Sequence, residues 1–259
     1  MNGHREIVQR SISLSLVIPT YGRGASLSET ITEMIGLLRA QRETVDISFE
    51  IILVDDASPD DTSAVLRNLC ARYPEVRGAV LAANCGQQNA TLAGIRMAEG
   101  TWVVTMDDDR KNDVRDIPRL LAELAAGCDV VYGVPAVESQ ARMLRRFGTR
   151  VKEHLLRRIC GKPSEIRLTS FRAMNRRTAD RVSRETRSKA YVSATLLLEP
   201  VRIGQVPVWE SPDAVSASGY KLPALVAQLW HIAVQYGRGP FARLFRKQGE
   251  PCPIKETFG

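Results

Sequence analysis

Short apolar segments alternate with amphipathic ones along the first half of the chain. The apolar runs predict buried strands at Ser13–Ile18, Phe49–Val54, Gly78–Ala82, Thr101–Met106 and Asp129–Gly133. Helical spacing of apolar residues predicts helices around Leu27–Leu38, Val65–Leu69, Ala90–Met97 and Ile117–Ala126. Strands and helices that alternate in this way predict an α/β fold built on a mostly parallel, doubly wound sheet.

Local residues also mark where some of these elements begin and end. Pro19 is expected to stop the first strand, because proline cannot donate to a sheet. Ser26–Glu29 has the pattern of a capping box. Ser58–Asp61 offers a cap, a proline for the first helical position and acidic residues for the first turn. We therefore expect helices to begin at these two segments.

The second half of the chain has a different pattern. It predicts a helix over Leu144–Ile159, a strand over Ile166–Met174, a helix over Ala190–Leu198, a strand over Val201–Trp209 and an amphipathic helix over Leu222–Val234. The Ser, Ala and Gly residues of Ser211–Tyr220 indicate a mobile loop, and the segment after Val234 mixes arginines with phenylalanines. We expect one α/β domain over residues 11–210 and, at 211–259, a loop, an amphipathic helix and a basic tail. That helix and tail suit a membrane interface or, equally, a helix packed on the core with a frayed tail.

Three carboxylates follow the strand that ends at Met106. Side chains alternate along a strand, so Asp107 and Asp109 are expected to point the same way and Asp108 the other way. Asp107 and Asp109 can ligate Mg²⁺ or Mn²⁺, although a solvated acidic turn is an open alternative. Pro19–Tyr21 and Asp55–Asp56 also lie at the ends of strands, and ligands of doubly wound sheets bind at that edge.

Charge and cysteine content narrow the class of protein. The 259 residues carry a net charge of +7; residues 138–187 hold fifteen Lys or Arg against five Asp or Glu, or +10, so the remainder carries −3. This asymmetry favours an anionic partner over solvated helix faces, and no nucleic-acid recognition motif is present. The five cysteines include no Cys-x-x-Cys pair, which argues against a disulfide framework or zinc site and for a reducing compartment. The first ten residues are too polar for a signal peptide.

An ordered set of motifs resembles glycosyltransferase family 2. The motifs are Leu16–Tyr21, Val54–Asp60, Asn84–Gln87, Met106–Asp109, Asp129–Gly133, Arg146–Thr149, Ser170–Met174 and Ser218–Leu222. Within the family, the sequence is most similar to the polyprenyl-phosphate transferases of the dolichyl-phosphate mannosyltransferase type. The resemblance covers Ser13–Gln235, which is nearly the whole chain.

The resemblance implies a GT-A fold, a nucleotide-diphosphate-sugar donor, a divalent cation and transfer with inversion. Carried onto this chain, Pro19, Tyr21 and Asp55 or Asp56 contact the base and ribose. Gln87 and Asp108 belong to the same nucleotide site. Asp107 and Asp109 hold Mg²⁺ or Mn²⁺ against the diphosphate and count, with Arg172, as catalytic residues.

The acceptor implied by the resemblance is a polyprenyl phosphate. Its oxygen is already anionic near neutral pH, so it needs a cationic cradle more than a base, and we expect Arg146, Arg150 and Arg172 to supply one. The chain departs from the family pattern at Gly22–Arg23, at Asp108, at Arg110–Lys111, where a cation replaces an amide, and at Asp213, where an arginine is usual.

Three functions therefore stay open. The first is transfer to a polyprenyl phosphate by a cytoplasmic protein that sits peripherally on the inner face of the membrane. The second is transfer to a soluble hydroxyl, which would need a carboxylate base that the sequence does not single out. The third is a non-catalytic membrane-surface adaptor, which the Asp107/Asp109 pair disfavours. The sequence does not predict the oligomeric state.

Overall fold

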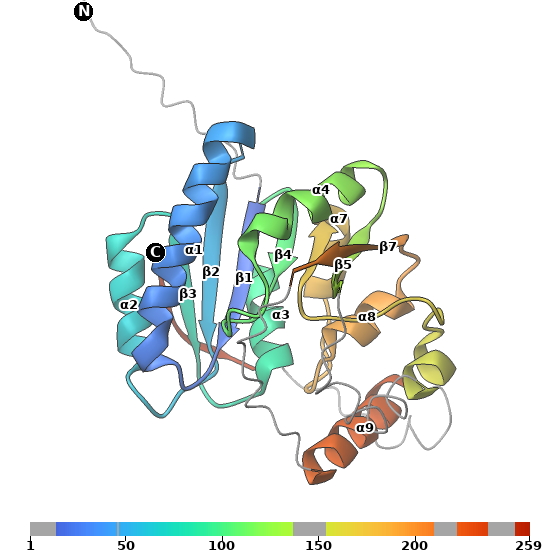
Figure 1. Ribbon diagram of the computed structural model, residues 1–259. Coiled ribbons are helices and arrows are strands. Elements are labelled where there is room, and N and C mark those ends of the chain that lie inside the picture. Colours follow the sequence, from blue (N-terminus) through green and yellow to red (C-terminus); the bar gives the residue numbers. More distant parts are fainter. Residues whose placement is uncertain (1–13, 46, 137–153, 210–221, 238–251) are drawn as a thin grey trace, which may run out of the picture.

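The computed structural model describes residues 14–45, 47–136, 154–209, 222–237 and 252–259. They form one eight-stranded sheet in the order β7-β5-β6-β4-β1-β2-β3-β8 (Figure 1). The strands are β1 (Leu14–Thr20), β2 (Phe49–Asp55), β3 (Val76–Leu81), β4 (Trp102–Thr105), β5 (Val130–Pro135), β6 (Arg172–Asn175), β7 (Ile203–Val208) and β8 (Ile254–Phe258). Strand β6 runs antiparallel to β4 and β5, and β8 runs antiparallel to β3, whereas the other neighbours are parallel. The expected α/β fold with a mostly parallel sheet is confirmed.

Helices cover both faces of this sheet. One layer contains α1 (Gly24–Val45), α2 (Thr62–Arg72) and α4 (Ile117–Ala125), and the other contains α3 (Gln87–Met97), α7 (Arg176–Ser183) and α8 (Val192–Leu198). The alternation of side chains along the strands creates the two cores. In β1, Leu16 and Ile18 pack in the first layer, whereas Val17 packs in the second. Buried on both faces, the central strands have continuous apolar sequences.

The helix α9 (Leu222–Tyr236) packs through its last turns on the domain. Ile232 and Tyr236 join a small core with Leu156, Cys160 and Ala194 of α8. Residues 154–160 are helical, in agreement with the end of the predicted helix over Leu144–Ile159. Among the described residues, none of the helices combines the length and the apolarity that crossing a bilayer requires.

Several predicted boundaries were wrong for local reasons. Strand β1 passes through Pro19. The Val17 carbonyl accepts a hydrogen bond from the Met106 amide, so the backbone of Val17 faces β4. Pro19 lies two residues later and faces the same side. The pairing with β4 has already ended there, so the missing N–H of proline costs no hydrogen bond. Helix α1 begins at Gly24, so Ser26 lies inside it and does not cap it. Helix α2 begins at Thr62 rather than near Pro59, because Ser58 bonds back to Asp55.

Two further expectations need correction. The strand predicted over Ile166–Met174 is only β6 (Arg172–Asn175). The expectation that the cysteines form no disulfide was wrong for one pair, because Cys85 and Cys252 are bonded across 167 positions. Strand β8, which the pattern did not predict, brings Cys252 beside the loop after β3. Residues 254–258 are therefore part of the sheet, although the sequence grouped them with the tail at 211–259.

Candidate active site

A cavity of about 610 Å³ opens at the edge where the parallel strands β1 to β4 end. It is lined by Pro19, Thr20, Tyr21, Arg23, Asp56, Asn84, Gly86, Gln87, Gln88, Asp107, Asp108, Asp109, Lys111, Leu168, Thr169, Ser170, Arg172, Tyr191 and Ser193. The segments after β1, β2, β3 and β4 form one wall, and those before β6 and at the start of α8 form the other. The site thus lies where a doubly wound sheet is expected to bind its ligand.

The cavity brings together most of the residues that the sequence singled out. Pro19, Tyr21, Asp56, Gln87, Asp107, Asp108, Asp109 and Arg172 all line it. Asp55 does not, because its fully buried side chain turns toward the backbone and hydroxyl of Ser58. Its second oxygen, Oδ2, is buried and has no hydrogen-bond partner among the described residues. Arg146, Arg150 and Asp213 lie outside the described residues.

All three carboxylates of Asp107–Asp109 face the cavity. The prediction that Asp108 points away was wrong, because β4 ends at Thr105 and strand alternation does not extend to these residues. Asp108 accepts a hydrogen bond of 2.6 Å from the Thr20 hydroxyl and lies 3.4 Å from the Arg23 guanidinium. It therefore binds to the β1 wall of the cavity.

Asp107 and Asp109 have separate protein partners. Asp107 accepts hydrogen bonds from the Gln87 amide at 2.5 Å and from the Ser170 hydroxyl at 2.7 Å. Asp109 accepts from the backbone amide of Lys111 and forms an ion pair with its ammonium group. The cation found at position 111 thus acts directly on one of the two predicted metal ligands.

The chemistry of these carboxylates fits a divalent cation. Burial raises the pKa of Asp107, and the neighbouring Asp109 and Asp108 raise it further; burial likewise raises the pKa of Asp108. In the described part of the chain, no three His, Cys, Asp or Glu side chains are grouped as a ready-made metal site. Mg²⁺ typically binds one or two carboxylates together with substrate phosphates, so a pair of carboxylates in an open cavity is sufficient.

Asp56 anchors the loop after β3 to the wall of the cavity. Its two carboxylate oxygens accept the backbone amides of Cys85 and Gly86 at 2.7 and 2.8 Å. Burial raises the pKa of Asp56 despite these hydrogen bonds. The loop leads directly to Gln87, so its position also sets that of the group which holds Asp107.

Arg172 is a buried cation without a described acidic partner. Its side chain is 1% exposed, and it donates to the hydroxyls of Thr105 at 3.1 Å and Ser193 at 2.7 Å. Tyr132, its partner in the β5–β6 register, has a buried hydroxyl that lacks a hydrogen-bond partner among the described residues. A buried charge is costly unless it is paired, so this wall of the cavity is suited to an anion.

Comparison with known proteins identifies the family. The Glycosyl transferase family 2 model matches residues 15–183, which is more than half of the chain. The chain belongs to glycosyl transferase family 2. This confirms the family proposed from the sequence motifs.

Several curated relatives share one name, which includes undecaprenyl phosphate. The undecaprenyl-phosphate 4-deoxy-4-formamido-L-arabinose transferase of Sodalis glossinidius is 30% identical over 221 residues, covering 85% of this chain and 66% of the relative. A protein of the same name from Pseudomonas aeruginosa is 36% identical over 151 residues, covering 57% of this chain and 42% of the relative. The chain thus spans less than two thirds of the length of these curated relatives.

Solved structures confirm the GT-A fold expected for family 2. A mannosyltransferase of Pyrobaculum calidifontis in complex with GDP-Man and Mn²⁺ superposes with a TM-score of 0.55 at 20% identity, covering 92% of this chain and 65% of that one. Glucosyl-3-phosphoglycerate synthase of Mycobacterium tuberculosis, in complex with Mn²⁺, UDP and phosphoglyceric acid, gives a TM-score of 0.57 at 18% identity, covering 86% and 76%. At these identities the likeness establishes the fold alone.

Some lining residues of this family 2 site were not predicted. Arg23 and Lys111 were visible only as departures from the family pattern, and both contact the carboxylates. Ser170 belongs to the motif that contains Arg172, but its contact with Asp107 had no sequence signal. Tyr191 and Ser193 lie at the start of α8, and nothing in the apolar pattern shows that this end of the helix faces the cavity.

Proposed function

We propose that this protein transfers a sugar from a nucleotide-diphosphate-sugar to a polyprenyl phosphate, with inversion and with Mg²⁺ or Mn²⁺. Membership of family 2 and the names of the curated relatives support this proposal. The observation that carries it is the pairing, in one cavity, of a carboxylate cluster with the buried Arg172. The first suits a metal-bound diphosphate, and the second suits another phosphate.

The donor would occupy the wall formed by the ends of β1 to β4. Pro19 and Tyr21 would contact the base. The Tyr21 side chain is half exposed, so its ring is free to stack on the flat ring of a base. Carboxylates at the end of β2 can accept from ribose hydroxyls or from a base N–H. Asp56 lines the cavity, whereas Asp55 is fully buried outside its lining, and its Oδ2 has no hydrogen-bond partner among the described residues. Asp107 and Asp109 would hold the cation, which supplies Lewis-acid stabilisation of the charge on the leaving diphosphate.

The acceptor phosphate would bind at Arg172. The arginine orients the phosphate and keeps its oxygen near the sugar, and that oxygen is already anionic at neutral pH. It forms a bond to the anomeric carbon while the bond from that carbon to the donor diphosphate breaks, so no proton has to be removed. One displacement inverts the anomeric centre. Arg146 and Arg150 belong to the same proposal for the acceptor phosphate.

The first test separates donor and acceptor. Calorimetry with Mn²⁺ across UDP-, GDP- and other nucleotide sugars should identify the donor, which is then incubated with undecaprenyl phosphate and with soluble alcohols. We expect glycosylation of the lipid phosphate only. Transfer to alcohols alone would support the soluble-acceptor function, and donor binding without any transfer would support the adaptor.

Substitution of the metal ligand tests the donor half of the site. Asp107→Ala should lower transfer by about 100-fold or more, because a group that stabilises the leaving charge is lost. It should also abolish the enhancement of donor binding by Mn²⁺ in calorimetry. Asp180→Ala, at an exposed aspartate of α7, is the matched control and should behave as the wild type. Full activity of Asp107→Ala would refute the assignment.

Substitution of Arg172 tests the acceptor half. Arg172→Lys keeps the buried charge but loses the fork of donors, so the KM for the lipid phosphate should rise at least tenfold while the Kd for the donor stays the same. Circular dichroism checks that the variant folds, and Arg184→Ala serves as an exposed control. Equal losses in donor and acceptor binding would contradict the assigned role.

A further inference from the structure

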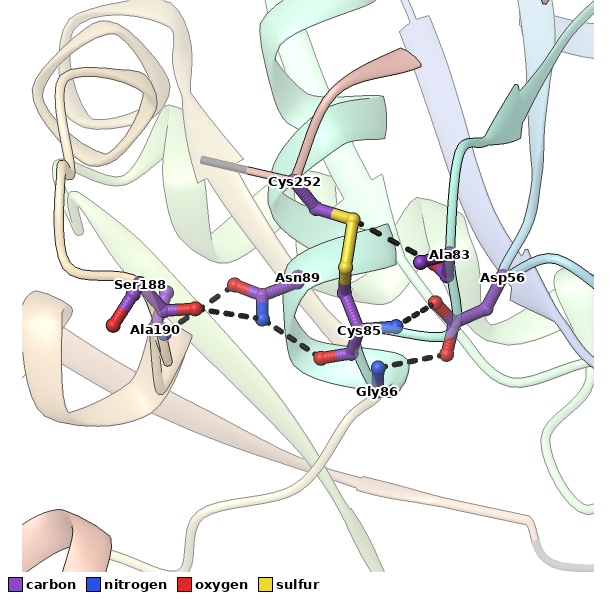
Figure 2. The surroundings of a disulfide bond; sticks show 8 residues. All are labelled: Asp56, Ala83, Cys85, Gly86, Asn89, Ser188, Ala190 and Cys252. Carbon is purple, nitrogen blue, oxygen red and sulfur yellow. Dashed lines mark hydrogen bonds between the residues drawn. A yellow bond between two sulfur atoms is a disulfide. The ribbon is translucent and has the colours of Figure 1, made fainter. Parts of the chain in front are cut away.

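The disulfide joins the C-terminal strand to the wall of the proposed donor site. Cys85 lies in the loop between β3 and α3, and Cys252 precedes β8; their Cα atoms are 6.2 Å apart (Figure 2). Both cysteines are only partly buried, and the neighbouring Ala83, Asn84 and Gly86 are exposed. The sulfur atoms therefore lie within reach of a reagent in solution.

On the Cys85 side, the bond acts on a residue whose backbone is hydrogen-bonded in both directions. The Cys85 amide donates to Asp56, and the Cys85 carbonyl accepts from the Asn89 side chain at 2.8 Å (Figure 2). Asn89 also donates to the Ser188 carbonyl at 3.3 Å, next to the segment that leads into α8. The position of Cys85 thus affects Asp56 on one wall of the cavity and the approach to the opposite wall.

On the Cys252 side, the noncovalent contacts come from a short segment. Cys252 packs against the second core, and Phe258 packs against the first core and lies 4.9 Å from the Arg67 guanidinium. Strand β8 has five residues and pairs only with β3, and the Pro253 carbonyl accepts the Ala82 amide at 2.9 Å. Its ion pair, Arg67–Glu256, joins two exposed side chains, and pairs of this kind contribute little to stability. Such a short edge strand therefore relies on the disulfide for a stable connection to the loop between β3 and α3.

We infer that Cys85–Cys252 is a thiol–disulfide exchange site that controls donor affinity, an inference that rests on the proposed function and on the cytoplasmic location expected from the sequence. Disulfides in reducing compartments are mostly transient, catalytic or redox-sensing. The co-reactant is a protein or small-molecule dithiol. Its thiolate attacks one sulfur and forms a mixed disulfide, and its second thiol then displaces the cysteine. Two electrons and two protons pass to Cys85 and Cys252, and the dithiol becomes a disulfide; the reverse exchange restores the bond.

Reduction changes the constraint on the loop rather than the chemistry of the site. Once the bond is broken, β8 is held by its ladder with β3 and by the contacts of Glu256 and Phe258 with Arg67, and residues 82–86 gain freedom. The amides of Cys85 and Gly86 then bind Asp56 for a smaller fraction of the time. The donor must order the loop when it binds, which costs conformational entropy. Reduction should therefore weaken nucleotide binding several-fold.

The test uses the full chain in its oxidised form and after treatment with dithiothreitol. Differential alkylation with peptide mapping should show Cys85 and Cys252 blocked before reduction and free afterwards. Amide exchange should then rise in residues 82–89 and 252–258, and the calorimetric Kd of UDP or GDP with Mn²⁺ should rise several-fold. Cys252→Ser should match the reduced protein and ignore dithiothreitol. Cys128→Ser, at a free cysteine, should keep the full response.

The outcomes separate this inference from the proposed function. The inference is overturned if the two cysteines stay free under oxidising conditions, or if reduction changes neither the exchange of residues 82–89 nor nucleotide affinity. If neither nucleotide binds in either state, the proposed function fails, and the exchange data alone decide whether the bond constrains the loop. A bound nucleotide whose Kd is unchanged by reduction refutes the inference and leaves the proposed function standing.

Discussion

At the scale of residues, the main feature is that each carboxylate of Asp107–Asp109 is bound by a different part of the protein. Gln87 and Ser170 orient Asp107, Thr20 and Arg23 bind Asp108, and Lys111 neutralises Asp109. The cluster of negative charge is thus shared among groups that lie on several segments of the cavity wall. A cation bound at Asp109, as proposed, would have to compete with the ammonium group of Lys111.

Removal of this competitor gives the first prediction at the residue scale. Lys111→Gln should raise the affinity for Mn²⁺ several-fold in the absence of nucleotide, because the cation no longer displaces a paired ammonium from Asp109. Paramagnetic titration of free Mn²⁺ measures the change directly. Lys189→Gln removes an exposed lysine outside the cavity and should leave the affinity unchanged. A lower affinity in Lys111→Gln would mean that the lysine helps to assemble the site.

The sequence predicted the chemical types in this site better than their contacts. Eight of the nominated residues line the cavity. Six of them follow parallel strands, whose ends meet at one edge, whereas Pro19 lies at the end of β1 and Arg172 at the start of the antiparallel β6. Asp55 and Asp56 could not be told apart, since their different orientations depend on Ser58 and on the amides of Cys85 and Gly86. The direction of Asp108 was missed because the end of β4 is set by tertiary pairing rather than by local sequence.

At the scale of elements, α9 is attached to the domain by a polar cluster at its C-terminal end. The Tyr236 hydroxyl accepts the Tyr191 amide at 2.8 Å, and its ring lies 4.5 Å from the Arg187 guanidinium. Burial raises the pKa of Tyr236 to about 12, so the group is neutral at physiological pH. Tyr191 lines the cavity, so this cluster connects α9 to the proposed acceptor wall.

Tyr236→Phe tests that attachment. The substitution leaves the part-buried amide of Tyr191 without this acceptor and should lower the free energy of unfolding by about 1–3 kcal/mol. Urea denaturation measures this loss. Phenylalanine keeps the ring and its contact with Arg187, so a loss near zero would mean that the hydroxyl contributes nothing to holding α9.

The carboxylate of Glu185 makes the same cluster sensitive to pH. Burial raises the pKa of Glu185, but hydrogen bonds from Thr195 and Arg187 outweigh it, and the net shift is downward from 4.5. A carboxyl with a lowered pKa stabilises the fold above its unfolded pKa, and this stability is lost as the pH falls through the folded value. We expect Glu185→Gln to flatten the decline in unfolding free energy below about pH 4.5. An unchanged slope in urea titrations at pH 3 to 6 would contradict this.

The sequence predicted the strands that are buried on both faces, and it missed the element that is held by contacts between residues far apart in the chain. The central strands and α4 follow continuous apolar runs or a clear helical stripe, so each was found within a few residues. Strand β8 has the polar sequence of an edge strand, and its place beside β3 comes from a pairing between distant parts of the chain. The disulfide Cys85–Cys252 could not be predicted for the same reason, because its cysteines lie 167 positions apart in the sequence.

At the scale of the whole molecule, the positive charge is unevenly distributed, which bears on the proposed lipid acceptor. The excess of positive charge lies in residues 138–187, and four more cations follow α9 at Arg238, Arg243, Arg246 and Lys247. Trp230, on α9, is 54% exposed. A basic sequence that follows a helix with an exposed tryptophan is typical of proteins that bind at the surface of an anionic membrane.

Neutralisation of these cations tests membrane attachment without removing β8. Replacement of Arg238, Arg243, Arg246 and Lys247 by glutamine should release the protein from vesicles that contain phosphatidylglycerol, since each cation near such a surface contributes about 1 kcal/mol. Flotation of the full chain measures the loss. A control removes the same number of exposed charges at Arg39, Arg72, Arg115 and Arg119, and it should still float. Equal flotation of both variants would show that these four cations do not contribute to membrane binding.

The place of β8 at the rim of the sheet has one more consequence. If β8 lifts away, β3 presents a row of unpaired backbone groups flanked by Val76, Ala79 and Leu81, and such a row can template the addition of a strand from another copy. While β8 is in place, Lys255 and Glu256 put charges on the outermost strand and discourage that growth. Protein from which β8 has been removed by proteolysis should therefore aggregate, seen as a slow rise in turbidity, before it unfolds.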